Sequence, residues 1–314
     1  MGVREFVEEH YKHFNAGELA RCAYSLREFL AGGGRLIVTL AGAMSTAEIG
    51  RSLGPAIRQQ RVHAICCTGA NLEEDLFSLI SRGEYERVPD WRQQSGEDDA
   101  ELAKRGLNRV TDVAIPESTI TKVGEKLTVL WEEAEAVGDS RFPHEYFYDL
   151  LLHGKLDFSS PPENSWLMAS ADANLPIFTP GWEDSTIGNL LAARVLDCTL
   201  KSNTIVRTGL DAMQSLADWY REDDSPTGIL QVGGGISGDF AISVVPMLRQ
   251  DAQVDVPLWS WFAQISESRP SYGGYSGAPP NEKISWGKLG VDTPRFVIES
   301  DASIVLPLLF SSLE

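Results

Sequence analysis

Trp286 and Lys288 stand two positions apart in the stretch NEKISWGKLG (residues 281–290) of a chain with an excess of acidic residues. If this stretch is extended, residues at positions i and i+2 face the same side. The indole would then keep water away from the ammonium group and favour the neutral amine, a nucleophile that forms imines. Most lysines are solvated surface charges, and Trp286 could be an ordinary core residue. The pairing nevertheless predicts a covalent site at Lys288.

Residues suited to binding a cationic amine occur in the same stretch and beside glycine-containing turns. Protonated amines need carboxylate partners and aromatic faces. Any one of these acids is more often a helix cap or a surface charge, so only their joint placement predicts a polyamine site. The acids are Glu73, Glu74, Asp184, Asp239 and Glu282, and the aromatic residues are Tyr272, Tyr275 and Trp286.

Buried strands that pass through small residues into amphipathic helices must position these side chains. The pattern occurs four times, in residues 35–53, 62–80, 175–196 and 228–248. Such units predict an α/β fold, with a doubly wound and mostly parallel sheet and helices on both faces. A further strand at RFVIES (295–300) and a helix after it are expected to close the chain.

Glycine-containing turns after two of these strands could bind phosphate groups. In doubly wound folds, backbone N–H groups and a helix N-terminus face the anion at the carboxyl edge of the sheet. The candidates are Thr68-Gly69 and the triplet 233–235. Neither forms a GxGxxG motif, so a purely structural turn is the more common alternative. The helix after Thr68-Gly69 is expected to hold the three acids at 73–75 in its first turn, where they suit the helix dipole.

The chain is expected to form one compact domain. Its 314 residues, 43% of them hydrophobic, can bury a large core. Residues 1–34 are predicted as an N-terminal helical segment and residues 35–314 as the α/β domain. A charged helical insertion is predicted at about 89–142 within that domain.

Charge and residue spacing exclude several function classes. The formal net charge of −18 argues against nucleic acid as a partner. The four cysteines show no CxxC or Cys/His metal spacing, which predicts a reduced, cytoplasmic protein. No run of about 18 apolar residues occurs, so no membrane partner is expected. His10 and His13 lack a third ligand, and His144 and His153 lack a triad partner, so neither a metal site nor hydrolase chemistry is expected.

Four long motifs of the chain resemble those of deoxyhypusine synthases. They are CTGANLEEDL (67–76), FTPGWEDSTIGNL (178–190), VGGGISGDF (232–240) and SGAPPNEKISWGKLGVDTPRFVIESDASIVLPLLF (276–310). In this order they cover most of the chain from about Arg35 onward, and the resemblance is greatest to the bacterial deoxyhypusine-synthase-like branch, which includes homospermidine synthases. The resemblance implies a Rossmann-like α/β domain and a homotetramer with NAD and amine sites at subunit interfaces.

The resemblance also implies a reaction and its site residues. In this family NAD takes a hydride from spermidine, the resulting imine loses 1,3-diaminopropane, and an enzyme lysine holds the aminobutyl group before an acceptor amine receives it. The matching lysine is Lys288, in SWGK. The implied NAD contacts are Ser45, Thr46, Thr68, Gly69, Glu74, Asp184, Gly234, Asp301 and Ala302. The implied amine contacts are Glu73, Asn189, Asp239, Tyr275, Glu282 and Trp286.

Three positions depart from the eukaryotic pattern of this family. Asn189 and Tyr275 each stand where those enzymes have an aspartate, and Asp239 stands where they have a histidine. Two acids are thus lost and one is gained in the amine pocket. A charge-assisted contact contributes about 1.5–3 kcal/mol, which is enough to change the preferred amine.

Several functions therefore stay open at the level of sequence. The first hypothesis is an NAD-dependent aminobutyl transferase that uses spermidine and putrescine and forms homospermidine. The second changes the acceptor to a lysine of a translation-factor protein, which gives deoxyhypusine. A third, of a different class, is a non-catalytic protein that senses polyamine or NAD. An ordinary dehydrogenase would need a proton-transferring side chain near the nicotinamide, and the sequence suggests none.

Overall fold

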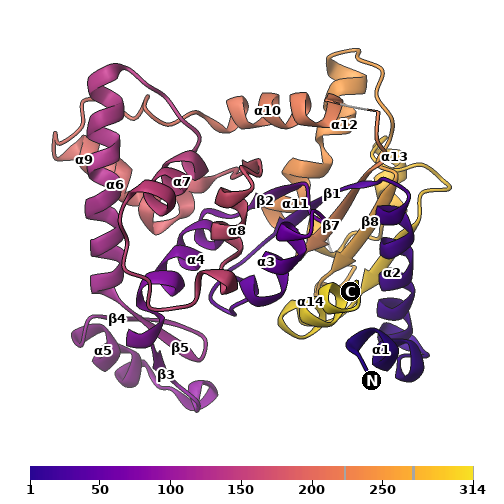
Figure 1. Cartoon of the computed structure of the whole chain (residues 1–314), viewed down its shortest axis with the longest axis horizontal. Helices are drawn as coiled ribbons and strands as arrows, with labels where there is room; N and C mark the ends of the chain where they lie inside the picture. The colour runs from indigo at the N-terminus through magenta and orange to yellow at the C-terminus, as the bar shows by residue number, and fades with distance from the viewer. Residues whose placement is uncertain (223, 271–272, 314) are drawn as a thin grey trace.

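The computed structural model describes residues 1–222, 224–270 and 273–313; Tyr272, one of the predicted aromatic residues, lies outside them. Its centre is a six-stranded sheet in the order β6-β2-β1-β7-β8-β9, in which every pair is parallel (Figure 1). The strands are β1 Arg35–Leu40, β2 Ala64–Cys67, β6 Ile177–Phe178, β7 Thr227–Val232, β8 Trp261–Ile265 and β9 Arg295–Ile298. Strand order runs outward in both directions from β1 and β7, as in doubly wound folds. This confirms the predicted fold class.

Helices cover both faces of the sheet. Alternate residues of a strand therefore pack into the hydrophobic core on one face or the other. In β1, Leu36, Val38 and Leu40 pack into one hydrophobic cluster and Ile37 into another. The first cluster lies under α2 Phe14–Ala31, α3 Gly50–Arg58, α4 Gly69–Ser81, α6 Glu117–Val137, α7 Pro143–His153, α8 Trp166–Asp172, α9 Thr186–Leu196 and α14 Ala302–Ser311. The second lies under α10 Gly209–Arg221, α11 Gly235–Ile242 and α12 Val244–Pro246, which a π-helical turn at Met247–Asp251 continues.

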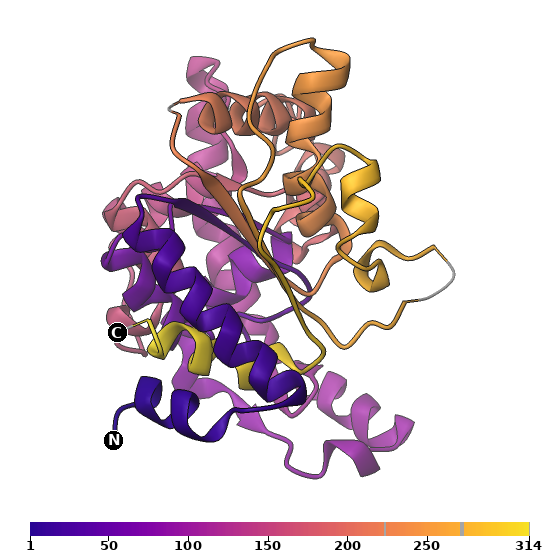
Figure 2. The same ribbon diagram turned by 90° about the vertical axis from the view of Figure 1, so that its right-hand side faces the viewer.

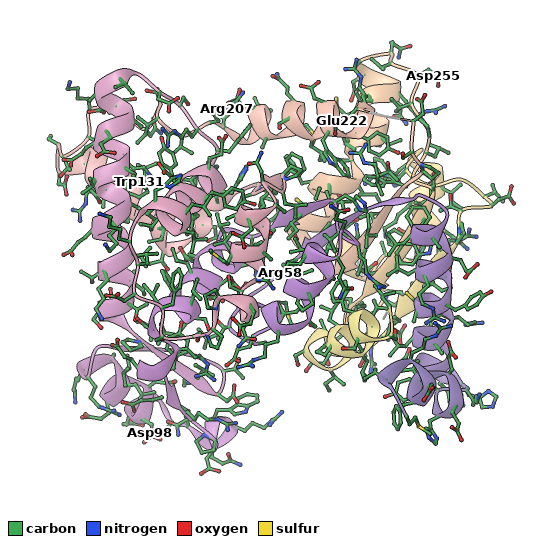
Figure 3. All side chains as sticks on the ribbon, viewed as in Figure 1. Arg58, Asp98, Trp131, Arg207, Glu222 and Asp255 are labelled. Atoms are coloured by element: carbon green, nitrogen blue, oxygen red, sulfur yellow. The ribbon has the colours of Figure 1, made fainter. Side chains whose placement is uncertain are left out.

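Side chains fill the space between these elements (Figure 3). Trp131 of α6 is 1% exposed and belongs to the larger cluster, whereas Arg58 at the end of α3 donates to the backbone carbonyl of Glu163 at 2.8 Å. Residues before β1 form α1 Val3–His10 and α2, and α2 packs along β9 and beside α14 (Figure 2). No helix among the described residues combines the length and apolar character needed to cross a bilayer.

The interval 89–142, in which a charged helical insertion was predicted, holds two α-helices and part of a small sheet. It contains α5 Gly96–Lys104 and α6, but also two strands of a small antiparallel sheet. The sheet has the order β3-β5-β4, with β3 Glu86–Arg87, β4 Leu107–Val110 and β5 Val113–Pro116. Thr111 between β4 and β5 has a φ of 54°, a left-handed conformation that closes the hairpin. Threonine rarely adopts this conformation, and the turn contains neither glycine nor asparagine, so nothing in the sequence indicated the hairpin.

Candidate active site

Every residue expected to contact a dinucleotide follows the carboxyl end of a strand of the large sheet. Because all six strands are parallel, these ends lie at one edge of the sheet, and the β1/β7 pair is the point where strand order reverses. Ser45 and Thr46 follow β1, Thr68, Gly69 and Glu74 follow β2, Asp184 follows β6, Gly234 follows β7, and Asp301 and Ala302 follow β9. The structure thus brings all nine to one edge.

A buried amide that sequence reasoning missed connects the first two of these loops. The Asn71 side chain is 0% exposed, and its Nδ2 donates to the carbonyl of Gly42 at 2.8 Å and to Thr68 Oγ1 at 2.9 Å. Its Oδ1 accepts from the Ser45 backbone N–H at 3.0 Å. The Ser45 hydroxyl also accepts a hydrogen bond from Trp166 Nε1 at 2.9 Å. The only sequence signal was an asparagine three residues after a threonine N-cap.

The three acids of α4 lie in its second turn, so their expected place in the first turn is wrong. Thr68 is the N-cap and Gly69 already belongs to the helix. Glu73, 3% exposed, accepts from the backbone N–H groups of Thr186 and Ile187 at 3.0 and 2.8 Å. Burial raises the pKa of Glu73. Within this chain, its carboxylate therefore caps the start of α9.

The neighbouring acids Glu74 and Asp75 are also withdrawn from water. Glu74 accepts from the hydroxyl of Thr46 at 2.6 Å, which joins two predicted cofactor residues, and burial raises the pKa of Glu74 to about 7. Burial raises the pKa of Asp75 to about 6, although Asp75 accepts from the Ser165 hydroxyl and from the Leu167 N–H. The edge therefore carries carboxyl groups that titrate near neutral pH.

A pH dependence of stability follows from Glu74. Its pKa is higher in the folded chain than in the unfolded one, so its contribution to stability is fully present below about pH 4.5 and is lost as the pH rises through about 7. We expect Glu74→Gln to raise the free energy of unfolding at pH 8 by about 1–3 kcal/mol and to leave it nearly unchanged at pH 4.5. Urea unfolding at both pH values, without added dinucleotide, measures this. The exposed-residue control Glu125→Gln should change neither value, and an equal gain at both pH values for Glu74→Gln would contradict the assignment.

The glycine triplet after β7 connects this edge to the lysine stretch. Gly233 and Gly235 have φ values of 79° and 57°, which favour glycine. A Cβ on Gly234 would lie 2.3 Å from Ser276 Oγ, so that close approach also requires glycine. The backbone N–H of Gly235 donates to the same hydroxyl at 3.0 Å. Ser276, which the sequence reasoning did not single out, thus joins the triplet to the loop that carries Tyr275.

The stretch around Lys288 is not extended, and this corrects the geometry inferred from the sequence. Glu282–Ser285 form the short helix α13, Trp286 is its C-cap, and Gly287 has a φ of 67°. Trp286 is 67% exposed, so its indole does not keep Lys288 dry within this chain. Lys288 is nevertheless only 8% exposed. Its burial was predicted correctly, but for the wrong reason.

Asp239 and Tyr275 are the near neighbours of the lysine. Lys288 Nζ donates to Asp239 Oδ1 at 3.0 Å. It lies 5.4 Å from the Tyr275 ring centroid and 6.0 Å from that of Trp286. The Tyr275 hydroxyl accepts from Gln231 Nε2 at 2.6 Å, and Gln231 is fully buried in β7. The Tyr275 ring, held by a hydrogen bond from β7, is therefore the aromatic group that faces Lys288.

These residues line one cavity of about 500 Å³. It contains five of the predicted residues, Asp239, Tyr275, Glu282, Trp286 and Lys288. It also contains Lys283, which the sequence reasoning missed because most lysines are surface residues. Lys283 is 3% exposed, and burial, with the charge of Lys288 as the next cause, lowers the pKa of Lys283 to about 8.

Two predicted amine contacts lie elsewhere. Among the described residues that line the cavity, neither Glu73 nor Asn189 occurs. Asn189 Nδ2 donates to the carbonyls of Glu183 and Ser185, both at 2.8 Å, at the start of α9. The chain by itself therefore separates the predicted amine contacts into two groups. No group of three His, Cys, Asp or Glu side chains suited to a metal occurs in the part of the chain that the structure describes.

The exposure of Trp286 gives a stability prediction. Trp286→Ala removes a mostly solvated ring, so we expect the free energy of unfolding to change by less than about 0.5 kcal/mol. Trp259 is the matched buried residue, 0% exposed with its Nε1 donating to the Ile242 carbonyl at 3.1 Å, and Trp259→Ala should cost about 3–5 kcal/mol. Chemical denaturation of both variants measures the difference. A loss of more than about 2 kcal/mol in Trp286→Ala would show that the indole packs into the fold.

Comparison with known proteins identifies the family of this chain. The family model for deoxyhypusine synthase matches residues 6–313. A "Deoxyhypusine synthase-like protein" of Nostoc punctiforme is 26% identical over 322 aligned positions, which cover 98% of this chain and 79% of the relative. "Probable deoxyhypusine synthase 2" of Methanosarcina mazei is 28% identical over 279 positions, 88% of this chain and 76% of the relative.

A solved structure shares the fold. The crystal structure of a "putative deoxyhypusine synthase" from Entamoeba histolytica has a TM-score of 0.60 at 13% identity and covers 99% of this chain and 92% of that one. At this identity the likeness concerns the fold alone. The family match spans nearly the whole sequence and includes the cavity around Lys288. The chain therefore belongs to the deoxyhypusine synthase family, whose members are NAD-dependent aminobutyl transferases.

Proposed function

We propose that this protein takes a 4-aminobutyl group from spermidine, holds it as an imine on Lys288 and passes it to putrescine, which gives homospermidine. The observation that carries the proposal is the environment of Lys288 Nζ. The amine is nearly buried, yet it lines a cavity of about 500 Å³ beside a carboxylate and an aromatic ring. A buried amine that still faces a cavity is suited to attack a bound carbon rather than to solvate the surface.

The roles of the cavity residues follow from their chemistry. NAD, when bound, would supply the redox chemistry, taking a hydride from the carbon beside the amine nitrogen of spermidine and returning it to the imine of the product. Neutral Lys288 attacks the oxidised carbon, forms the C–N bond and releases 1,3-diaminopropane. Asp239 and Glu282 supply carboxylates for the cationic nitrogens of the substrate, and the Tyr275 ring supplies an aromatic face. The acceptor amine then displaces Lys288, which regains its free amino group.

The edge of the sheet fits a dinucleotide. The Gly235 position has open space around it, so the backbone of the triplet allows a phosphate to approach closely. Thr46 and Glu74, linked at 2.6 Å, offer a hydroxyl and a carboxyl group suited to ribose hydroxyls. We assign NAD contacts to the loops after β1, β2, β6, β7 and β9, through Ser45, Thr46, Thr68, Gly69, Glu74, Asp184, Gly234, Asp301 and Ala302.

A second copy of the chain is proposed to complete the site. Glu73 and Asn189 do not line the cavity of Lys288. On this proposal one subunit supplies Glu73 and Asn189, a second supplies the residues of the Lys288 cavity, and the two sets contact the same amine. Exposed apolar side chains support an interface, since Val291 and Ile236 are 73% and 52% exposed. We therefore propose a homotetramer with shared sites, and a cytoplasmic location. Light scattering coupled to size-exclusion chromatography measures the assembly state.

The acceptor is decided by product analysis. Purified protein is incubated with NAD, spermidine and putrescine, and the amines are identified by mass spectrometry. Homospermidine and 1,3-diaminopropane are the expected products. The alternative is a protein lysine as acceptor, an activity that the name of the Methanosarcina relative describes. Labelled spermidine that reaches a translation-factor protein but not putrescine would favour this alternative.

A further inference from the structure

A second lysine shares the cavity with Lys288. Lys283 is 3% exposed, against 8% for Lys288. Lys283 Nζ lies 4.9 Å from the Tyr275 ring centroid, and Lys288 Nζ lies 5.4 Å from the same centroid. Two ammonium groups held near one ring and away from water repel each other more strongly than they would in solution.

The two amino groups have unequal partners. Lys288 Nζ donates to the Asp239 carboxylate at 3.0 Å, whereas Lys283 Nζ donates to the backbone carbonyl of Ala278 at 3.2 Å. The second aromatic neighbour of Lys283 is Phe262, with its ring centroid at 5.2 Å. The Asp239 carboxylate therefore bonds directly to Lys288, while Lys283 bonds to a neutral carbonyl. A buried ammonium group whose hydrogen-bond partner is neutral is costly.

Other ionisable groups also act on the pair. Glu282 of α13 and Asp251 of the π-helical turn line the cavity and are exposed, as Asp239 is, and the charges of Glu282 and Asp239 only partly offset the lowering of the Lys283 pKa by burial and by Lys288. Burial raises the pKa of Tyr275 well above its usual value, so its phenol is neutral at the relevant pH. Asp239 of α11 is the carboxylate that bonds to Lys288.

We infer that Lys283 is a positioning residue for Lys288, because the two amino groups compete for one carboxylate and one aromatic ring and together give up a proton more readily than a lone buried lysine. The inference rests on the proposed function, in which Lys288 must be neutral to form the imine. The pKa of about 8 at Lys283 agrees with it, and protons leave such a pair in steps that belong to both groups. On this inference, the charge of Lys283 acts on the reactivity of the Lys288 amine.

Competitive acetylation tests the coupling without any amine transfer. The purified protein is treated with trace acetic anhydride between about pH 6 and about pH 11, and fragment-ion mass spectrometry quantifies acetyl-Lys288. We expect Lys283→Met to lower the acetylation rate of Lys288 at pH 8 about tenfold, the effect of one pKa unit. Lys283→Arg keeps a positive charge and should stay within about twofold of the unmodified protein. Lys126→Met, an exposed lysine on α6, is the matched control and should change nothing.

Two results would overturn the inference. One is a Lys288 titration in Lys283→Met that superimposes on that of the unmodified protein, and the other is a Lys283→Arg profile identical to that of Lys283→Met. Thermal unfolding checks that each variant folds, and Lys283→Gln replaces the methionine variant if that one does not. Borohydride trapping with spermidine and NAD, run in parallel, separates the two proposals. Coupled titration without an adduct defeats the proposed function alone, whereas an adduct with uncoupled titration defeats the role of Lys283 alone.

Discussion

Lys288→Arg is expected to abolish the covalent adduct with spermidine and to lower aminobutyl transfer by at least about a thousandfold. The guanidinium group stays protonated and cannot form the imine, while it keeps the positive charge that faces Asp239. Borohydride trapping in the presence of NAD and spermidine, followed by peptide mass spectrometry, locates the adduct. Calorimetric titration should show that NAD binding is retained, because the loops assigned to NAD lie outside the lysine cavity.

The same experiment separates the enzyme from a sensor. Lys201→Arg changes an exposed lysine and should leave trapping at the level of the unmodified protein. Full transfer by Lys288→Arg would refute the imine mechanism. If the unmodified protein binds spermidine reversibly but never yields an adduct with NAD present, a non-catalytic polyamine-binding role replaces the proposed one.

Asp239→Asn is expected to have the second largest effect, in two opposite directions. The carboxylate bonds to Lys288 Nζ at 3.0 Å, so its loss removes the direct anionic partner of the ammonium and favours the neutral amine. The acid side of the pH–rate profile should therefore move to lower pH. The cationic substrate loses a charge partner at the same time, and a contact of about 1.5–3 kcal/mol predicts a KM for spermidine at least about tenfold higher.

Initial rates across pH and spermidine concentration measure both effects. Asp251→Asn is the matched control, since Asp251 is an exposed carboxylate that lines the same cavity, whereas Asp239 is the carboxylate to which Lys288 donates, and the effect of Asp251→Asn on KM should be smaller. An Asp239→Asn enzyme with an unchanged KM and an unchanged pH profile would show that this carboxylate serves neither the lysine nor the amine.

The sheet could be predicted from the sequence where a strand ends in a visible turn. β1, β2, β6 and β7 each pass through small residues into a helix, and the sequence carries that transition. β8 was missed because the residues that follow its sequence, WFAQI, do not form a strand–turn–helix unit. Gln264 is 2% exposed and donates from Nε2 to the Ser276 carbonyl at 2.8 Å, so only the folded loop explains a polar residue there.

The site was predicted in its residue types better than in its geometry. Lys288 and Asp239 are 49 positions apart, and their 3.0 Å contact depends on how α11 meets α13. That Glu73 binds an amine stays a prediction; within this chain the fold brings the start of α9 to it, and these two backbone contacts could not be read from the sequence. Lys283 gave no signal because its burial depends on Tyr275 and Phe262, which come from other segments.

The glycine turn after β7 and the lysine cavity beside it are built from different parts of the fold. The loops assigned to the dinucleotide start from five strand ends, so a change there disturbs the sheet itself. The side chains around Lys288 come instead from α11, α13 and the loop before α13, which carry none of the strand pairing. If the proposed function holds, substitutions at Asp239, Tyr275 or Lys283 would change the preferred amine without disturbing the strands from which the dinucleotide loops start.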